Sequence, residues 1–312
     1  MLTQLRRQMK VNRWLTKVKT FTDGLNTRHR DTIGGSLWLA PSLLGIATFY
    51  ILPFFVVVYY SVISSPINPN FVFFNNFTSL FANNAFRTAA SNTLKFSLVA
   101  VPLAVVLSLL IALMLETRIP FKSYFRTFFL SPLMVPVASV VLIWQVLFHP
   151  SGAINELIMI FGADSIDWMQ SEHSQFVVVV LFLWKNLGFN MILFMAALSN
   201  IPRELLETAD VEGAGAFSKF FNIKIRYLSP TLLFVTILSL INSFKVFREV
   251  YLLTGDYPYG DLYMIQHFMN NMFRSLDYQR LAAAAVVMTI AMVIIILTLF
   301  IAENRFGRDV EE

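Results

Sequence analysis

Charged residues interrupt two of the most apolar segments of this chain, and their types could serve a binding site. Lys185 stands near the middle of one segment, within LFLWKNLGFN. Lys245, Arg248 and Glu249 stand together in another, within INSFKVFREVY. Charges inside an apolar span are costly and usually face a bundle interior or a wet cavity, which indicates a pathway for a polar solute. Alternatively, Lys245 and Arg248 extend to the outer interface, or Arg248 and Glu249 pair with a partner subunit.

The sequence lacks the motifs of the common catalytic and nucleotide sites. It contains no Gly-x-x-x-x-Gly-Lys-Ser/Thr pattern for ATP binding and no dinucleotide-binding fingerprint. It also contains neither Gly-x-Ser-x-Gly nor His-Glu-x-x-His. There is no Cys, and the four His, at 29, 149, 173 and 267, have no metal-ligand spacing. We therefore expect a chain that is not an enzyme, with no catalytic residue, metal site or cofactor.

The composition is that of a polytopic membrane protein. Of the 312 residues, 56% are hydrophobic and 14% are charged, whereas soluble domains average about 25% charged residues. More than half of the net charge of +5 arises in the first 31 residues. Basic residues beside membrane spans set topology, so this charge does not indicate a nucleic-acid partner.

Six segments are each long enough to cross a bilayer, which predicts an all-α fold with six transmembrane helices. They lie near 36–63, 92–117, 123–148, 174–198, 229–253 and 281–303. The transmembrane domain would span 36–303, between a basic tail at 1–35 and a short tail at 304–312. Basic residues gather in alternate loops, which places both termini and the 201–230 loop in the cytoplasm.

The loop at 201–230 has the pattern of two short helices joined by a turn. Pro202 suits the first turn of a helix, and charges then alternate with apolar residues at helical spacing through Asp210. Gly213 and Gly215 allow a sharp turn. A second apolar helix follows from Phe217 and continues into the next span.

This loop resembles the EAA motif, the cytoplasmic coupling loop of binding-protein-dependent ABC importer permeases. Glu207–Ala209 occupy the first three motif positions, with Thr in place of the middle Ala, and Gly213 occupies the motif glycine. Arg226 stands where the motif has Pro. Because Arg does not interrupt a helix as Pro does, we expect an unbroken helix from about 217 into the fifth span.

The resemblance extends over roughly residues 38–303 and is closest to the sugar-importer branch. Asn92-Thr93 resembles the start of the permease core, and WQVLFHPSGAIN at 144–155 resembles a further family stretch. The resemblance implies the ABC importer type I permease fold in a bacterial plasma membrane. It also implies four kinds of partner: a second, similar permease, two ATP-binding subunits, an extracytoplasmic solute-binding protein and a carbohydrate substrate. ATP and Mg²⁺ would bind only to the ATPases.

The resemblance assigns two sets of site residues by position. The coupling helix would dock on an ATPase, and closure of the ATPases would move this helix. The docking residues would be Glu204, Glu207, Ala209, Asp210, Gly213 and Ala214. The fourth and fifth spans line the substrate pathway in the resembling sugar permeases. The corresponding residues are Lys185, Asn186, Phe189, Ser239, Ser243 and Val246, with Asn242 as a neighbouring polar candidate.

Other transport functions remain open from the sequence. The importer could carry glycerol phosphate, and the cationic excess from Lys185, Lys245 and Arg248 would suit an acidic sugar. A secondary transporter driven by an ion gradient would use buried carboxylates, and here Glu249 and Glu116 are the only candidates. A membrane-embedded enzyme would need a convergent catalytic set, which the sequence does not offer.

Overall fold

The computed structural model describes residues 27–117 and 120–306 of the chain. The chain divides into two units, Met1–Tyr60 and Ser61–Glu312. The described part of the first is a helical run of α2 (Thr27–Ile46), the π-helical η1 (Ala47–Ile51) and α3 (Leu52–Ser61). The π-helical turn lies between Pro41 and Pro53. Residues 1–26 of the predicted tail lie outside the described residues, and α2 begins within the remainder of that tail.

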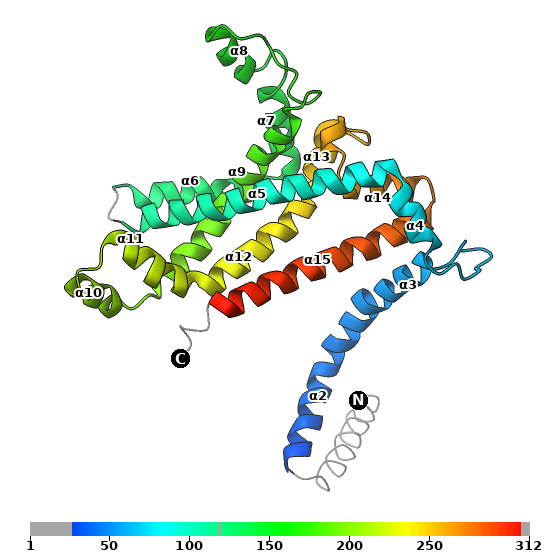
Figure 1. Ribbon diagram of the computed structural model, residues 1–312, viewed down its shortest axis with the longest axis horizontal. Coiled ribbons are helices and arrows are strands. Elements are labelled where there is room, and N and C mark those ends of the chain that lie inside the picture. The colour runs from blue at the N-terminus through cyan, green and yellow to red at the C-terminus, as the bar shows by residue number, and fades with distance from the viewer. Residues whose placement is uncertain (1–26, 118–119, 307–312) are drawn as a thin grey trace, which may run out of the picture. The chain divides into compact units, whose positions relative to one another are not determined.

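The second unit is built from helices joined by short connections (Figure 1). In order they are α4 (Asn75–Ala82), α5 (Asn84–Glu116), α6 (Lys122–Met134), α7 (Val137–Leu147), α8 (Ala153–Ile160), α9 (Ser174–Ser199), α10 (Arg203–Val211), α11 (Ala216–Lys219), the π-helical η2 (Phe220–Lys224), α12 (Ile225–Lys245), α13 (Phe247–Thr254), the 3₁₀ turn η3 (Gly260–Leu262), α14 (Ile265–Arg274) and α15 (Tyr278–Phe306).

The described residues contain five helices long and apolar enough to cross a membrane, or six if one bent pair forms a single span. The predicted all-α fold is therefore confirmed, and the predicted six spans are reached when the bent pair is taken as one span. The second of these helices begins earlier than the predicted 92, because Asn83 caps α5. Its side-chain oxygen accepts hydrogen bonds from the backbone N–H groups of Ala85 and Phe86, at 2.8 and 3.3 Å.

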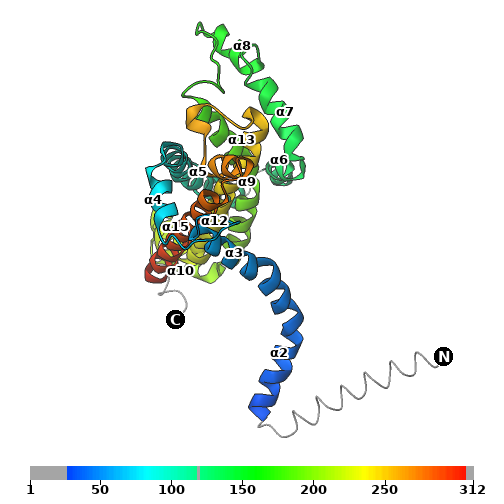
Figure 2. The ribbon, with the colours of Figure 1, turned by 90° about the vertical axis from the view of Figure 1, so that its right-hand side faces the viewer.

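The third predicted span, 123–148, is broken into two helices. It consists of α6 and α7, which are bent by 102° relative to each other. The break falls at Val135, whose backbone is extended (φ −86°, ψ 127°), as is favoured before a proline. Pro136 lacks the N–H that would continue the helix. In Figure 2, α7 leads away from α6 towards α8.

The helix after the 201–230 loop is continuous, as predicted from Arg226. One helical stretch of 39 residues runs from Ala216 to Thr254 and joins α11, η2, α12 and α13. It contains a π-helical turn at Phe220–Lys224 that the sequence did not indicate. The last helix, α15, continues beyond the predicted 303 to Phe306, and residues 307–312 of the predicted C-terminal tail lie outside the described residues.

The main core lies where α5, α9 and α12 run side by side (Figure 1). One buried cluster joins Val105 and Leu109 of α5 to Phe194 of α9 and Leu240 of α12. Lipid is as apolar as these side chains, so close van der Waals packing and interhelical hydrogen bonds hold such helices together. This packing fixes α9 and α12, the two helices that carry most of the candidate pathway residues.

Specific contacts define the two ends of this bundle. At one end, Lys224 Nζ lies 2.6 Å from Glu116 Oε2 at the end of α5. At the same end, Ser229 Oγ donates to Glu303 Oε1 near the end of α15, at 3.3 Å. At the other end, Asn92 Nδ2 donates to the carbonyls of Gly260 and Tyr263, at 2.6 and 3.1 Å. The 201–230 loop therefore lies at the same end of the bundle as the last turns of α5 and α15.

Candidate functional site

An ion pair joins the two helical segments that carry the intramembrane charges. Lys185, on α9, pairs with the carboxylate of Glu249, on α13. The Glu249 side chain is only 4% exposed, and that of Lys185 is 25% exposed. Arg248 lies farther away, with its Nη2 atom 3.8 Å from Glu249 Oε1. The sequence singled out all three residues, and the structure brings them together.

A cavity of approximately 190 Å³ opens beside this ion pair. Its walls come from α6, α9 and the α12–α13 region, and they combine amide, charged and apolar groups. The lining residues are Leu133, Leu181, Phe182, Lys185, Asn186, Asn242, Lys245, Val246, Arg248 and Glu249. A wall of this composition can hold a polar solute by hydrogen bonds and charge, with apolar surface for its non-polar faces.

Two amides connect α9 and α12 at this cavity. Asn242 Nδ2 donates to Asn186 Oδ1 at 2.9 Å. Asn186 in turn donates its amide N–H to the Phe182 carbonyl of its own helix at 2.8 Å. Both side chains are partly buried and line the cavity. They therefore present polar atoms in fixed orientations.

Three of the predicted pathway residues lie outside this cavity. Ser239 is fully buried and accepts a hydrogen bond from Asn190 Nδ2 at 2.9 Å. Ser243 is 1% exposed, and its Oγ lies 2.9 Å from that of Ser97 on α5. Phe189 is exposed on α9. The two serines thus connect helices in this conformation, and four predicted residues, Lys185, Asn186, Asn242 and Val246, line the cavity.

Gly188 allows α6 to approach α9 closely. A Cβ atom at this position would lie 1.8 Å from the Phe129 carbonyl oxygen of α6 and 2.5 Å from its carbonyl carbon. Only glycine fits such a backbone approach. The contact positions the half of the broken span that supplies Leu133 to the cavity. The sequence showed this glycine within LFLWKNLGFN, but its partner was not apparent.

The predicted coupling helix forms with its turn at Gly213. Helix α10 ends in a Schellman arrangement, in which the Ala214 N–H donates to the Ala209 carbonyl at 2.8 Å and the Gly213 N–H donates to the Asp210 carbonyl at 3.1 Å. Gly213 has φ +79°, a left-handed conformation that favours glycine. The expected turn is therefore present, and it reverses the chain between α10 and α11.

The two faces of α10 differ in exposure. Ala209 is buried, and Leu206 packs partly against the main core. Glu204, Glu207 and Val211 are exposed, Val211 to 90%. Their spacing of three and four residues places them on one helix face. The sequence had not singled out Val211, although an apolar residue so exposed at a helix end is a signal of contact with a partner.

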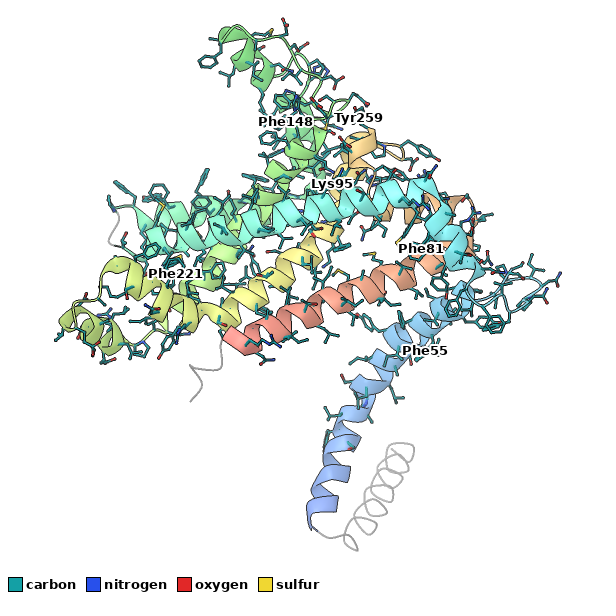
Figure 3. The ribbon with its side chains drawn as sticks, viewed as in Figure 1. Phe55, Phe81, Lys95, Phe148, Phe221 and Tyr259 are labelled. Carbon is teal, nitrogen blue, oxygen red and sulfur yellow. The ribbon has the colours of Figure 1, made fainter. Side chains whose placement is uncertain are left out.

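Ion pairs fix this loop to the helices behind it. Lys219 of α11 pairs with Asp210 at the end of α10. Lys224 pairs with Glu116 of α5, which holds the start of the long helix to its neighbour. Phe217 and Phe221 pack together at this end with ring centroids 4.6 Å apart and planes tilted by 48°, and Phe221 is labelled in Figure 3. Of the predicted coupling residues, Ala209 faces the bundle and Asp210 is engaged by Lys219.

Residues 27–117 and 120–306 contain no group of three or more His, Asp or Glu that could hold a metal ion. Among these described residues, one buried histidine with a strongly shifted pKa lies away from the cavity, on α14. Burial lowers the pKa of His267 to about 4. Its Nδ1 accepts a hydrogen bond from the Met264 N–H at 3.3 Å, so the neutral ring caps α14.

Comparison with known proteins identifies the family of this chain. The profile described as binding-protein-dependent transport system inner membrane component matches residues 98–312. The trehalose/maltose transport system permease protein MalF of Thermococcus litoralis is 30% identical over 90% of this chain and 97% of that protein. The sn-glycerol-3-phosphate transport system permease protein UgpA of Escherichia coli is 29% identical over 85% of this chain and 92% of that protein.

Further matches agree with this assignment. The sulfoquinovosyl glycerol transport system permease protein SmoG of Agrobacterium fabrum is 29% identical over 73% of this chain and 76% of that protein. A chain in the crystal structure of a bacterial ABC transporter that imports the acidic polysaccharide alginate superposes with a TM-score of 0.76, at 20% identity, over 89% of this chain and 99% of its own. The chain therefore belongs to the binding-protein-dependent transport system inner membrane components and has the fold of an ABC importer permease.

Proposed function

We propose that this chain forms half of the membrane pathway of an ABC importer for carbohydrates. The single observation that carries the proposal is the exposed face of α10, presented on a loop that ion pairs attach to α5 and α11. A helix held in this way can pass a movement of a docked ATPase on to the long helix Ala216–Thr254. Two ATP-binding subunits would supply that movement, and this chain would hydrolyse no ATP.

The second half of the pathway would be a different but similar permease. The cavity beside Lys185 and Glu249 would belong to the substrate pathway, with Asn186 and Asn242 offering hydrogen bonds to sugar hydroxyls. Carbohydrate is supported by the names of relatives, which include trehalose/maltose, arabinooligosaccharide and sulfoquinovosyl glycerol transport permeases. A solute-binding protein would deliver the substrate from the outer side.

The orientation in the membrane follows from charge and from the ends of the bundle. The 201–230 loop, with its basic Arg203, Lys219 and Lys224, lies at the same end as the last turns of α5 and α15. Basic loops stay in the cytoplasm. We therefore place this end, with both termini, in the cytoplasm of a bacterial plasma membrane, and the loops before α5, α9 and α15 outside.

Co-purification tests the proposal. The tagged chain is extracted from its native membrane in mild detergent, and its partners are identified by mass spectrometry. We expect an ATPase and a second permease. Glu207→Lys should release the ATPase, because it reverses a charge on the exposed face of α10, whereas Glu212→Lys, at the cap beyond this helix, serves as the matched control. A chain that purifies stably without any ATPase would contradict the proposal and favour an ion-driven carrier.

A further inference from the structure

The charges around the cavity are unbalanced. Its lining contains three cations, Lys185, Lys245 and Arg248, and one carboxylate, Glu249. Glu249 pairs with Lys185, and both charges are thereby accounted for. Within the described part of the chain, no other acidic side chain lines the cavity. The cavity therefore has an excess of two positive charges among its lining residues.

The two excess cations are available to a ligand. In the described part of the chain no acidic side chain lies within ion-pair distance of Lys245, and its side chain is exposed. The Arg248 side chain is 66% exposed, and among residues 27–117 and 120–306 its only ion-pair contact is the long one of 3.8 Å to Glu249. A spacing of three residues places Lys245 and Arg248 on one helix face, so both can reach the same anionic group.

We propose that this cavity binds a saccharide that carries an anionic group, a carboxylate, sulfate or phosphate, through Lys245 and Arg248. The proposal rests on the proposed function and gives its substrate a charge. Asn186 and Asn242, which already bridge α9 and α12, would orient the sugar hydroxyls beside that group. Lys185 contributes less, because Glu249 neutralises it.

The proposal is tested by isothermal titration calorimetry. The sample is the complex of this chain with its co-purifying partners in phosphatidylcholine nanodiscs. Trigalacturonate and maltotriose have the same number of rings and differ in charge. We expect trigalacturonate to bind at least about tenfold more tightly than maltotriose, as charge-assisted contacts are stronger than neutral ones. Lys245→Gln with Arg248→Gln should remove this difference by weakening trigalacturonate binding. Lys95→Gln is the matched control, since Lys95 is an exposed cation of α5 outside the cavity (Figure 3).

Each outcome decides the proposal. Equal affinity for the two probes, or an unchanged preference in the double variant, would overturn it. A headgroup of an anionic lipid is the other source of the same chemistry, so the titration is repeated in nanodiscs containing phosphatidylglycerol. Loss of trigalacturonate binding in these nanodiscs would indicate that Lys245 and Arg248 bind a lipid headgroup, and it would overturn the proposal that they bind an anionic saccharide. Co-purification of the ATPase is measured in a separate experiment. If the complex shows no preference for the anionic probe but still contains the ATPase, only the proposed substrate charge is wrong, and the proposed importer function is retained.

Discussion

Removing one partner of the Lys185–Glu249 pair should destabilise the protein more than removing both. Lys185→Met leaves a carboxylate that is 4% exposed, with Oε2 lacking any hydrogen-bond partner within the described residues. An uncompensated buried charge costs about 3–5 kcal/mol. Lys185 is itself 25% exposed and Arg248 lies 3.8 Å away, so we expect a somewhat smaller cost than this range, about 2–4 kcal/mol.

The double variant Lys185→Met/Glu249→Leu replaces the pair by apolar side chains of similar size. It should return to within about 1 kcal/mol of the native protein or exceed it, because both desolvation penalties disappear. The free energy of unfolding is measured by titration with sodium dodecyl sulfate in mixed micelles, followed by tryptophan fluorescence. The control is Lys219→Met, which removes a pair whose Asp210 side chain is 60% exposed and should cost less than about 1 kcal/mol. Equal costs for Lys185→Met and Lys219→Met, or additive costs in the double variant, would refute the reasoning.

Three further predictions concern single residues. Gly188→Ala should lower the free energy of unfolding by about 1–3 kcal/mol or more, since its Cβ would meet the Phe129 carbonyl, whereas Gly45→Ala, with open space around it, is the control in the same titration. Gly213→Val should weaken ATPase co-purification because valine resists φ +79°, while Gly213→Asn should retain it, since asparagine tolerates this conformation. Burial holds the pKa of His267 at about 4, below its ordinary 6.5. The unfolded chain therefore binds a proton first, and stability should fall as the pH drops from about 6.5 towards 4. His267→Gln should remove that slope, and a slope that persists in this variant would assign it to another group.

The coupling loop could be predicted closely because its signals are local. The charge pattern of Arg203–Asp210 and the glycine at 213 specify a short helix and its turn within one stretch of sequence, and the structure places α10 at Arg203–Val211. The continuation of the next helix through Arg226 also depends on local backbone chemistry. The location of the spanning helices follows from length and hydropathy alone.

The arrangement of the cavity could not be predicted in the same way. Lys185 and Glu249 are 64 residues apart in sequence, and nothing local indicates that they pair. In helices that are apolar on most faces, hydropathy does not distinguish the face that packs from the face that meets lipid. The family resemblance placed Ser239 and Ser243 in the pathway by position, and in this conformation they connect helices instead. The predicted span 123–148 gave no indication that α6 and α7 bend by 102° relative to each other.

The coupling loop and the cavity share one structural element, which is what alternating access needs. The helix Ala216–Thr254 carries Lys219, which holds α10, and about 45 Å farther along, at 1.5 Å per residue, it carries Glu249. A rotation of only about 5° about its loop end would therefore displace the ion pair by about 4 Å. Because Glu249 binds Lys185, α9 would follow, and the cavity between them would change shape. The π-helical turn at Phe220–Lys224 lies between the loop and the rest of the helix, and such turns often accompany functional sites. If that turn bends freely, the movement of α10 stays local. The ion pair between Lys224 and Glu116 favours a rigid turn, and a rigid turn would carry the movement to the substrate pathway.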